Sequence, residues 1–68
     1  MMKVIEDARL QLDMQQIELA RIMGVSKSTV CRWEKGERKP RYRKLRKLSV
    51  ILQVPLDELL YFFDNKVV

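Results

Sequence analysis

One stretch decides the fold of this chain: residues 16–36, which read QIELARIMGVSKSTVCRWEKG. Apolar residues in its first half recur at the spacing of one helical turn, and Gly24 follows them. A second helical period follows Ser26, whose hydroxyl can accept a hydrogen bond from a backbone N–H one turn further on. The stretch therefore predicts two helices, 16–23 and 26–35, joined by a tight turn.

The rest of the chain has the same helical spacing. No segment alternates with a period of two for long enough to predict a strand. We expect Pro40 and Pro55 to open the last two helices, and Asp57 and Glu58 to suit the positive end of the final one. The five predicted helices are 3–12, 16–23, 26–35, 41–53 and 56–63. We predict one all-α domain over residues 1–68, with a core from 3 to 63 and a short tail from 64 to 68.

The composition excludes several classes of site. A chain of 68 residues with one cysteine and no histidine cannot form a disulfide framework or a Cys/His zinc site by itself. The longest apolar run, 59–63, is far shorter than the roughly 20 residues of a membrane-spanning helix. Glu6 and Asp7 do not fit a signal peptide. We expect no metal, no cofactor, no membrane contact and a cytoplasmic location.

The positive charge is concentrated in one segment. The whole chain carries 14 basic and 9 acidic residues, for a net charge of +5. Residues 27–47 hold ten of the basic residues and two of the acidic ones, a net of +8, and the remainder sums to −3. Such a cationic patch on a slightly acidic body is typical of modules that bind polyanions. The alternative is a solvated basic helix with no partner.

The predicted helix 26–35 has two distinct faces. At about 100° per residue, Val30 and Trp33 lie on one side. Lys27, Cys31 and Arg32 lie on nearly the opposite side, so they face outward when Val30 and Trp33 are buried. Trp33 is therefore expected in the core and not as a base-stacking platform.

The residues of the 16–36 stretch resemble those of a known family. A small Ala20, a glycine four residues later and apolar Val25, Val30 and Trp33 match the phage Cro and repressor type of helix-turn-helix. Ala20 allows close helix approach, and the glycine can take a positive φ. The resemblance implies a compact five-helix, lambda-repressor-like domain whose third helix enters the DNA major groove.

The resemblance continues toward the carboxy terminus. Lys39 and Pro40, and the run from 45 to 60, look like the family's fourth and fifth helices. Two departures stand out: Gln53 replaces a common helix-ending glycine, and Pro55 replaces a common capping serine. We expect modest left-handed strain at Gln53 and a tolerated proline at the start of the last helix.

Three residues near the amino end of the third helix are the candidates for base contacts. Lys27 and Arg32 can donate to guanine O6 and N7, and Ser28 can serve several bases. The alternative is that these are simply exposed helix residues.

A second group is expected to contact DNA phosphates. Thr29 flanks the polar arc, and Gln16 matches the family's glutamine at the start of the second helix. Phosphate contacts add affinity without sequence information. The remaining candidates form a cationic run: Lys35, Arg38, Lys39, Arg41, Arg43 and Lys44.

The resemblance also implies an ion pair between Arg9 and Glu34, which would tie the first helix to the third. The alternative is two unrelated surface charges. Cys31 lies on the DNA-facing arc, where a redox switch is conceivable, although a small residue that tolerates its packing is the simpler interpretation.

Outward apolar residues favour a homodimer. Ile17, Ile22 and Val50 stand where the family often has polar residues, and the last helix ends in aromatic residues. A domain this small is not expected to bury all of them. The proposed dimer anchors are Tyr61, Phe62 and Phe63. The alternative is that they close the monomer's own core.

The sequence thus predicts a sequence-specific regulator of transcription that binds double-stranded DNA. We expect a repressor that reads a palindromic operator as a dimer, encoded by a bacterium or phage. The alternative is an antitoxin-type protein that neutralises a partner toxin. An enzyme is not expected, since there is no histidine base and no phosphate-binding loop. RNA binding is less well supported, because the basic surface has no aromatic side chains on which bases could stack.

Overall fold

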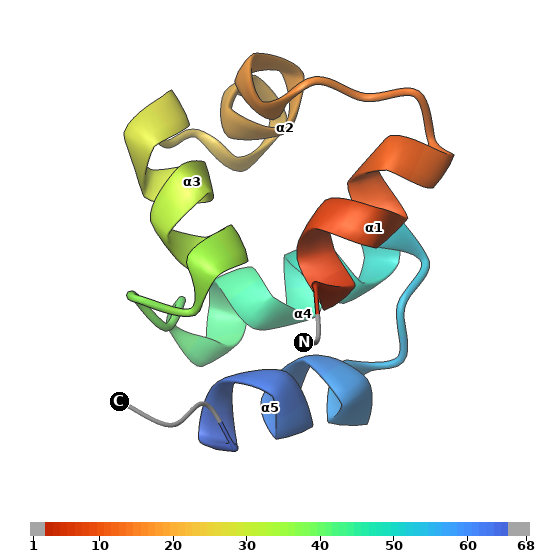
Figure 1. The fold of residues 1–68 in the computed structure, drawn as a ribbon, viewed down its shortest axis with the longest axis vertical. Helices are drawn as coiled ribbons and strands as arrows, with labels where there is room; N and C mark the ends of the chain where they lie inside the picture. The colour runs from red at the N-terminus through yellow and green to blue at the C-terminus, as the bar shows by residue number, and fades with distance from the viewer. Residues whose placement is uncertain (1–2, 66–68) are drawn as a thin grey trace.

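A computed structural model describes residues 3–65, and over that range the regular structure is entirely helical (Figure 1). The all-α prediction is confirmed, and each helix lies within one residue of its predicted bounds. The final three residues of the predicted tail lie outside the described range. The helices are α1 (Val4–Gln11), α2 (Gln16–Met23), α3 (Lys27–Lys35), α4 (Tyr42–Leu52) and α5 (Leu56–Asp64).

The helices surround one core. In Figure 1, α2 and α3 form the top and left of the molecule, α1 lies at the right and α5 at the bottom. α2 packs most extensively against α3, while α1 contacts α3, α4 and α5. Trp33 and Leu45 are among the largest fully buried side chains. The thirteen core residues come from all five helices: Ile5, Ala8, Leu19, Ala20, Met23, Val30, Trp33, Leu45, Leu48, Leu52, Leu59, Phe62 and Phe63.

The turn between α2 and α3 depends on Gly24. Its φ of 70° and ψ of 34° are left-handed, as predicted. A Cβ atom at this position would meet no heavy atom within 4 Å, so the requirement for glycine is conformational and not steric. The backbone N–H of Val25 donates to the carbonyl of Ala20 at 3.0 Å, which closes the helix end. This turn fixes the direction in which α3 leaves α2.

The connection between α4 and α5 contains the two departures from the family pattern. Gln53 ends α4 with φ 58° and ψ 42°, so the expected left-handed conformation is present in a residue with a side chain. The Ser49 hydroxyl donates to the carbonyl of Val54 at 2.6 Å and secures the helix end. Pro55 is the residue before the first turn of α5, and Pro40 lies two residues before α4. The prolines therefore precede these helices and do not lie inside them.

Candidate nucleic-acid interface

The position of α3 is fixed at its amino end by a serine cap. The Ser26 hydroxyl accepts a hydrogen bond from the backbone N–H of Thr29 at 3.2 Å, which confirms the predicted cap. The same hydroxyl lies 3.0 Å from the Ser28 hydroxyl and 2.9 Å from the Thr29 hydroxyl. Three hydroxyl groups therefore cluster at the start of the helix. Thr29 is half-buried within this cluster, whereas Ser28 is exposed.

The inner face of α3, formed by Val30, Trp33 and Glu34, is buried. Val30 and Trp33 enter the core, as their spacing predicted. The opposite side of the helix is thereby held toward solvent. A rotation of α3 that buried the outer side would expose Trp33 to solvent, which is unfavourable.

The outer face of α3 brings the predicted base-reading residues together. We define this face as Lys27, Ser28, Cys31, Arg32 and Lys35, and all but the half-buried cysteine are exposed. With neighbouring residues, the face lines an open hollow of about 450 Å³. The residues that line it are polar or charged apart from the cysteine. With three cations, Lys27, Arg32 and Lys35, the outer face of α3 suits an anionic surface.

Two residues that line this hollow come from outside α3: Gln16 and Glu37. Glu37 was not among the predicted site residues. It follows the glycine that ends α3, and its backbone N–H donates to the carbonyl of Arg32 at 2.9 Å. That local hydrogen bond folds the chain back beside the helix, and the sequence signal for it is the glycine at position 36.

The expected ion pair between Arg9 and Glu34 is present and buried. The Arg9 Nε donates to Glu34 Oε2 at 2.6 Å, and the two side chains are 8% and 5% exposed. A second guanidinium nitrogen donates to the carbonyl of Met14 at 2.7 Å. No buried side-chain nitrogen or oxygen among residues 3–65 is left without a hydrogen-bond partner. The pair therefore fastens α1 to α3 with its hydrogen bonds satisfied.

Gln16 is joined to the same ion pair. Its side-chain Nε2 donates to Glu34 Oε1 at 2.8 Å, and the residue is half-buried. The first residue of α2 is thus connected to the inner face of α3, a contact that its expected role on phosphate did not predict. The side-chain amide of Gln16 has two hydrogens. One is donated to Glu34, and the other takes no part in that hydrogen bond.

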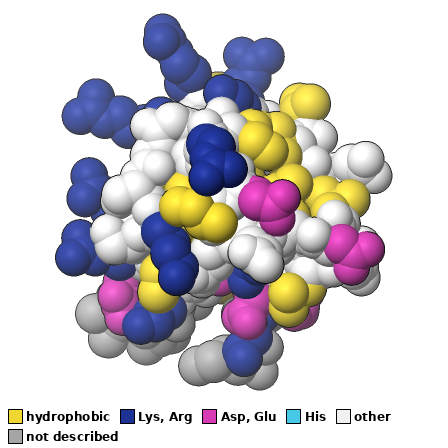
Figure 2. Space-filling view, turned by 90° about the horizontal axis from the view of Figure 1, so that it is seen from above, with side chains coloured by type: hydrophobic (Ala, Val, Ile, Leu, Met, Phe, Trp, Pro, Cys, Tyr) yellow, Lys and Arg dark blue, Asp and Glu magenta, His cyan; other side chains and the backbone are white. Residues whose placement is uncertain are grey.

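The cations of the predicted phosphate-binding run differ in whether another residue of the chain already contacts them. Figure 2 shows Lys and Arg side chains extending from the upper and left margins of one face, with Asp and Glu toward its right and lower parts. Lys39 forms an exposed ion pair with Asp64 at 2.8 Å. Lys44 is half-buried, and its Nζ donates to the carbonyl of Met23 at 3.4 Å. The other cations of the predicted run are exposed: Lys35, Arg38, Arg41 and Arg43.

The aromatic residues of α5 are divided between core and surface. Phe62 and Phe63 are 4% and 8% exposed, with ring centroids 4.9 Å apart in an edge-to-face arrangement. They close the monomer's own core, so the prediction that Phe62 and Phe63 anchor a dimer is wrong, and the stated alternative describes these two residues. Their helical positions adjoin Leu59 and point inward. Tyr61 is 58% exposed and is the one member of this group that remains available to a partner.

The expected exposure of the other apolar residues is confirmed for Ile17, Ile22 and Val50. Over residues 3–65, none of the helices has the length and apolar character needed to cross a membrane. That part of the chain also has no group of three or more Cys, Asp or Glu side chains that could hold a metal ion.

The chain is similar in sequence to helix-turn-helix proteins. The helix-turn-helix family matches residues 5–59, which is most of the chain. The cryptic phage CTXphi transcriptional repressor RstR of Vibrio cholerae is 38% identical over 55 residues, covering 81% of this chain and 50% of that protein. The chain therefore spans about half the length of this curated relative. No solved structure gives a significant match.

Proposed function

We propose that this chain, which belongs to the helix-turn-helix family, is a transcriptional regulator that binds specific sequences of double-stranded DNA. The observation that supports this function best is the outer face of α3, on which Lys27, Ser28 and Arg32 are exposed together. The buried inner face of the same helix keeps these side chains outward. The relative described as a transcriptional repressor favours repression as the direction of control.

In this proposal α3 lies in the major groove. A helix of its length is about 14 Å long, and the groove of B-DNA is roughly 12 Å wide. Lys27 and Ser28 at its amino end reach base edges first. Arg32, more than one turn later, donates two hydrogen bonds to guanine O6 and N7. Ser28 donates or accepts according to the base that it meets.

The surrounding residues hold the DNA backbone. Thr29 and the exposed cations Lys35, Arg38, Arg41 and Arg43 contribute phosphate contacts without reading sequence. Gln16 offers a phosphate the amide hydrogen that does not point to Glu34. Lys39 and Lys44 contribute only after their contacts with Asp64 and the end of α2 are broken or shared.

Binding as a homodimer is part of the proposal. Two recognition helices related by a two-fold axis would lie about 34 to 36 Å apart and read a palindrome. Tyr61 on α5 is the exposed aromatic residue available to such an interface. As a regulator of bacterial or phage DNA, the protein would act in the cytoplasm, at the nucleoid.

A second candidate function is that of an antitoxin, which would use exposed apolar residues such as Tyr61 to hold a toxin and would still bind DNA. Purification from the native host distinguishes the two. An unrelated small protein bound in stoichiometric amount favours the antitoxin, and purification without such a protein favours the stand-alone regulator.

In vitro selection from random duplex DNA tests the proposed function. We expect an enriched palindromic motif with half-sites one helical turn apart, found at both low and high salt. A triple variant, Lys27→Ala/Ser28→Ala/Arg32→Ala, serves as the matched control, because it should keep the helical circular dichroism and lose the motif. Failure of the wild-type chain to enrich any motif would contradict sequence-specific binding.

A further inference from the structure

The side of α4 that faces away from the core combines cations with exposed apolar residues. The core side of α4 is formed by leucines, and the opposite side is here called the outer face of α4. Val50 on this face is 78% exposed, more than any other large apolar residue of the described chain. A surface that served only to bind phosphates would not need it. The residues of the face line a hollow of about 460 Å³: Tyr42, Arg43, Arg46, Lys47 and Val50.

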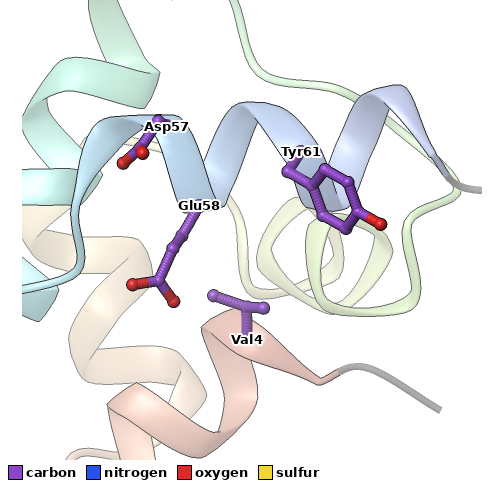
Figure 3. Close-up of a pocket in the computed structure, with 4 residues that line it drawn as sticks. All are labelled: Val4, Asp57, Glu58 and Tyr61. Carbon is purple, nitrogen blue, oxygen red and sulfur yellow. The ribbon is translucent and has the colours of Figure 1, made fainter.

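A second hollow lies between α1 and α5 and has the opposite charge. Val4, Asp57, Glu58 and Tyr61 line this α1–α5 groove, whose volume is about 570 Å³. Figure 3 shows Glu58 extending from α5 toward Val4 on α1, with the Tyr61 ring one turn further along α5. The groove therefore joins two carboxylates to an aromatic ring and a branched aliphatic side chain.

The two hollows carry opposite charges, so each is complementary to the other hollow and not to a second copy of itself. Each places apolar side chains beside charges of one sign, cations at the outer face of α4 and carboxylates in the α1–α5 groove. A dimer that set the α5 faces of two copies against each other would bring Asp57 and Glu58 near their own counterparts. Like charges across an interface are unfavourable, whereas opposite charges select a partner. The neighbouring carboxylate Asp64 does not relieve this, since it is also acidic and pairs with Lys39.

We propose that the outer face of α4 in one copy of this chain packs into the α1–α5 groove of a second copy. Arg46 and Lys47 then face the carboxylates of the groove. Val50 packs beside Tyr61, which supplies the apolar part of the contact. The contact joins two different surfaces, so it closes into a dimer when it is made twice around a two-fold axis and extends into a chain otherwise.

This inference rests on the homodimer of the proposed function and names its surfaces, which lie outside the base-reading residues, and it is tested without DNA. Failure of self-association would remove the homodimer and its palindrome, while sequence-specific binding by α3 would still stand or fall by its own selection experiment. Success would identify the surfaces that bring two recognition helices together. Arg43 is shared between the two proposals, so the test uses Arg46 and Lys47 instead.

Sedimentation velocity of the full chain over a range of concentrations measures the association. The first variant is Arg46→Glu/Lys47→Glu and the second is Asp57→Lys/Glu58→Lys. We expect each variant alone to associate about tenfold more weakly than the wild type. An equal mixture of the two should regain association close to that of the wild type, because each reversed surface then meets a reversed partner. Higher salt should weaken the wild-type contact.

The variant Asp57→Lys/Glu58→Lys can misfold, because Asp57 and Glu58 also stabilise the first turn of α5. A milder variant is therefore measured as well. Asp57→Asn/Glu58→Gln should weaken association if the groove receives the cationic face of α4. The same variant should strengthen association if two α5 faces meet each other, because it removes their repulsion. Stronger association of this variant, or a wild-type chain that stays monomeric at every concentration, would overturn the proposal.

Discussion

The inner and outer faces of α3 differ in burial and in the role that each is expected to have. The inner face is buried and holds a hydrogen-bonded ion pair, while the outer face is exposed and polar. Val30 and Arg32 are two residues apart, yet one has no exposed surface and the other is open to solvent. Substitutions on the inner face should therefore change stability, and substitutions on the outer face should change DNA recognition.

This division also explains why the inner face contains a charge. Glu34 accepts hydrogen bonds from Arg9 on α1 and from Gln16 on α2, so one carboxylate joins three helices. Apolar packing at Val30 and Trp33 holds α3 against the core without such directional bonds. We infer that the carboxylate sets the rotation of α3, and hence the direction of its outer face.

The largest effect is expected from breaking the inner face. Glu34→Ala leaves the Arg9 guanidinium buried without its partner, which should cost about 3 to 5 kcal/mol of unfolding free energy. Urea denaturation measures this loss. Glu37→Ala is the matched control, because it removes the same charge three residues away at an exposed position and should change stability by less than about 0.5 kcal/mol. Equal small losses in the two variants would contradict a structural role for the pair.

A double replacement sharpens the same point. Arg9→Met/Glu34→Leu removes both charges and fills the space with apolar side chains, which is often neutral for a buried pair. The Met14 carbonyl and the Gln16 amide lose their partners, so some loss remains. We expect the double variant to unfold at a higher urea concentration than either Arg9→Met or Glu34→Leu alone. A double variant as unstable as the sum of the singles would show that the two charges are not coupled.

A smaller effect is expected at Lys35, which lies on the outer face of α3 and is proposed to contact a DNA phosphate. Lys35→Ala should weaken binding to all duplex sequences alike and should lower the slope of log K against log salt by about 0.9. Its stability should stay within about 0.5 kcal/mol of the wild type. Fluorescence anisotropy titrations at several salt concentrations measure the slope, and an unchanged slope would remove Lys35 from the phosphate contacts.

The smallest effect is expected at the exposed ion pair between Lys39 and Asp64, whose side chains are 49% and 58% exposed. Asp64→Asn should cost less than about 1 kcal/mol of stability, because solvent screens an exposed pair. The same change frees Lys39 for phosphate, so DNA should bind more tightly at low salt. The gain should disappear near 1 M salt, where the Debye length is about 3 Å. A variant that binds DNA less tightly than the wild type would exclude Lys39 from the contacts.

The sequence predicted the helices well because their signals are local. Ser26 caps α3 and Gly24 ends α2 through contacts within one turn, and both features are visible as residue types at fixed spacing. The resemblance to the helix-turn-helix family is confirmed by the match over residues 5–59. The ion pair at Glu34 followed from that resemblance, since no local pattern joins residues 25 positions apart.

The features that the sequence did not predict depend on tertiary contacts. Phe62 and Phe63 were expected at a dimer interface, but the packing of α5 against α1 and α4 provides enough cover to bury both. Lys39 and Lys44 looked like free cations, because their partners lie on distant segments. The number of apolar residues alone did not indicate which of them the fold would cover.

The central claim is that the outer face of α3 reads base pairs, and a comparison of two arginines tests it most directly. Arg32→Ala and Arg38→Ala remove the same charge from exposed positions. The affinity of each variant is measured on the selected operator and on random duplex DNA at one salt concentration. We predict that Arg32→Ala lowers the preference for operator by about 1 to 3 kcal/mol, while Arg38→Ala weakens both DNAs equally. Equal losses on both DNAs for Arg32→Ala would contradict the account.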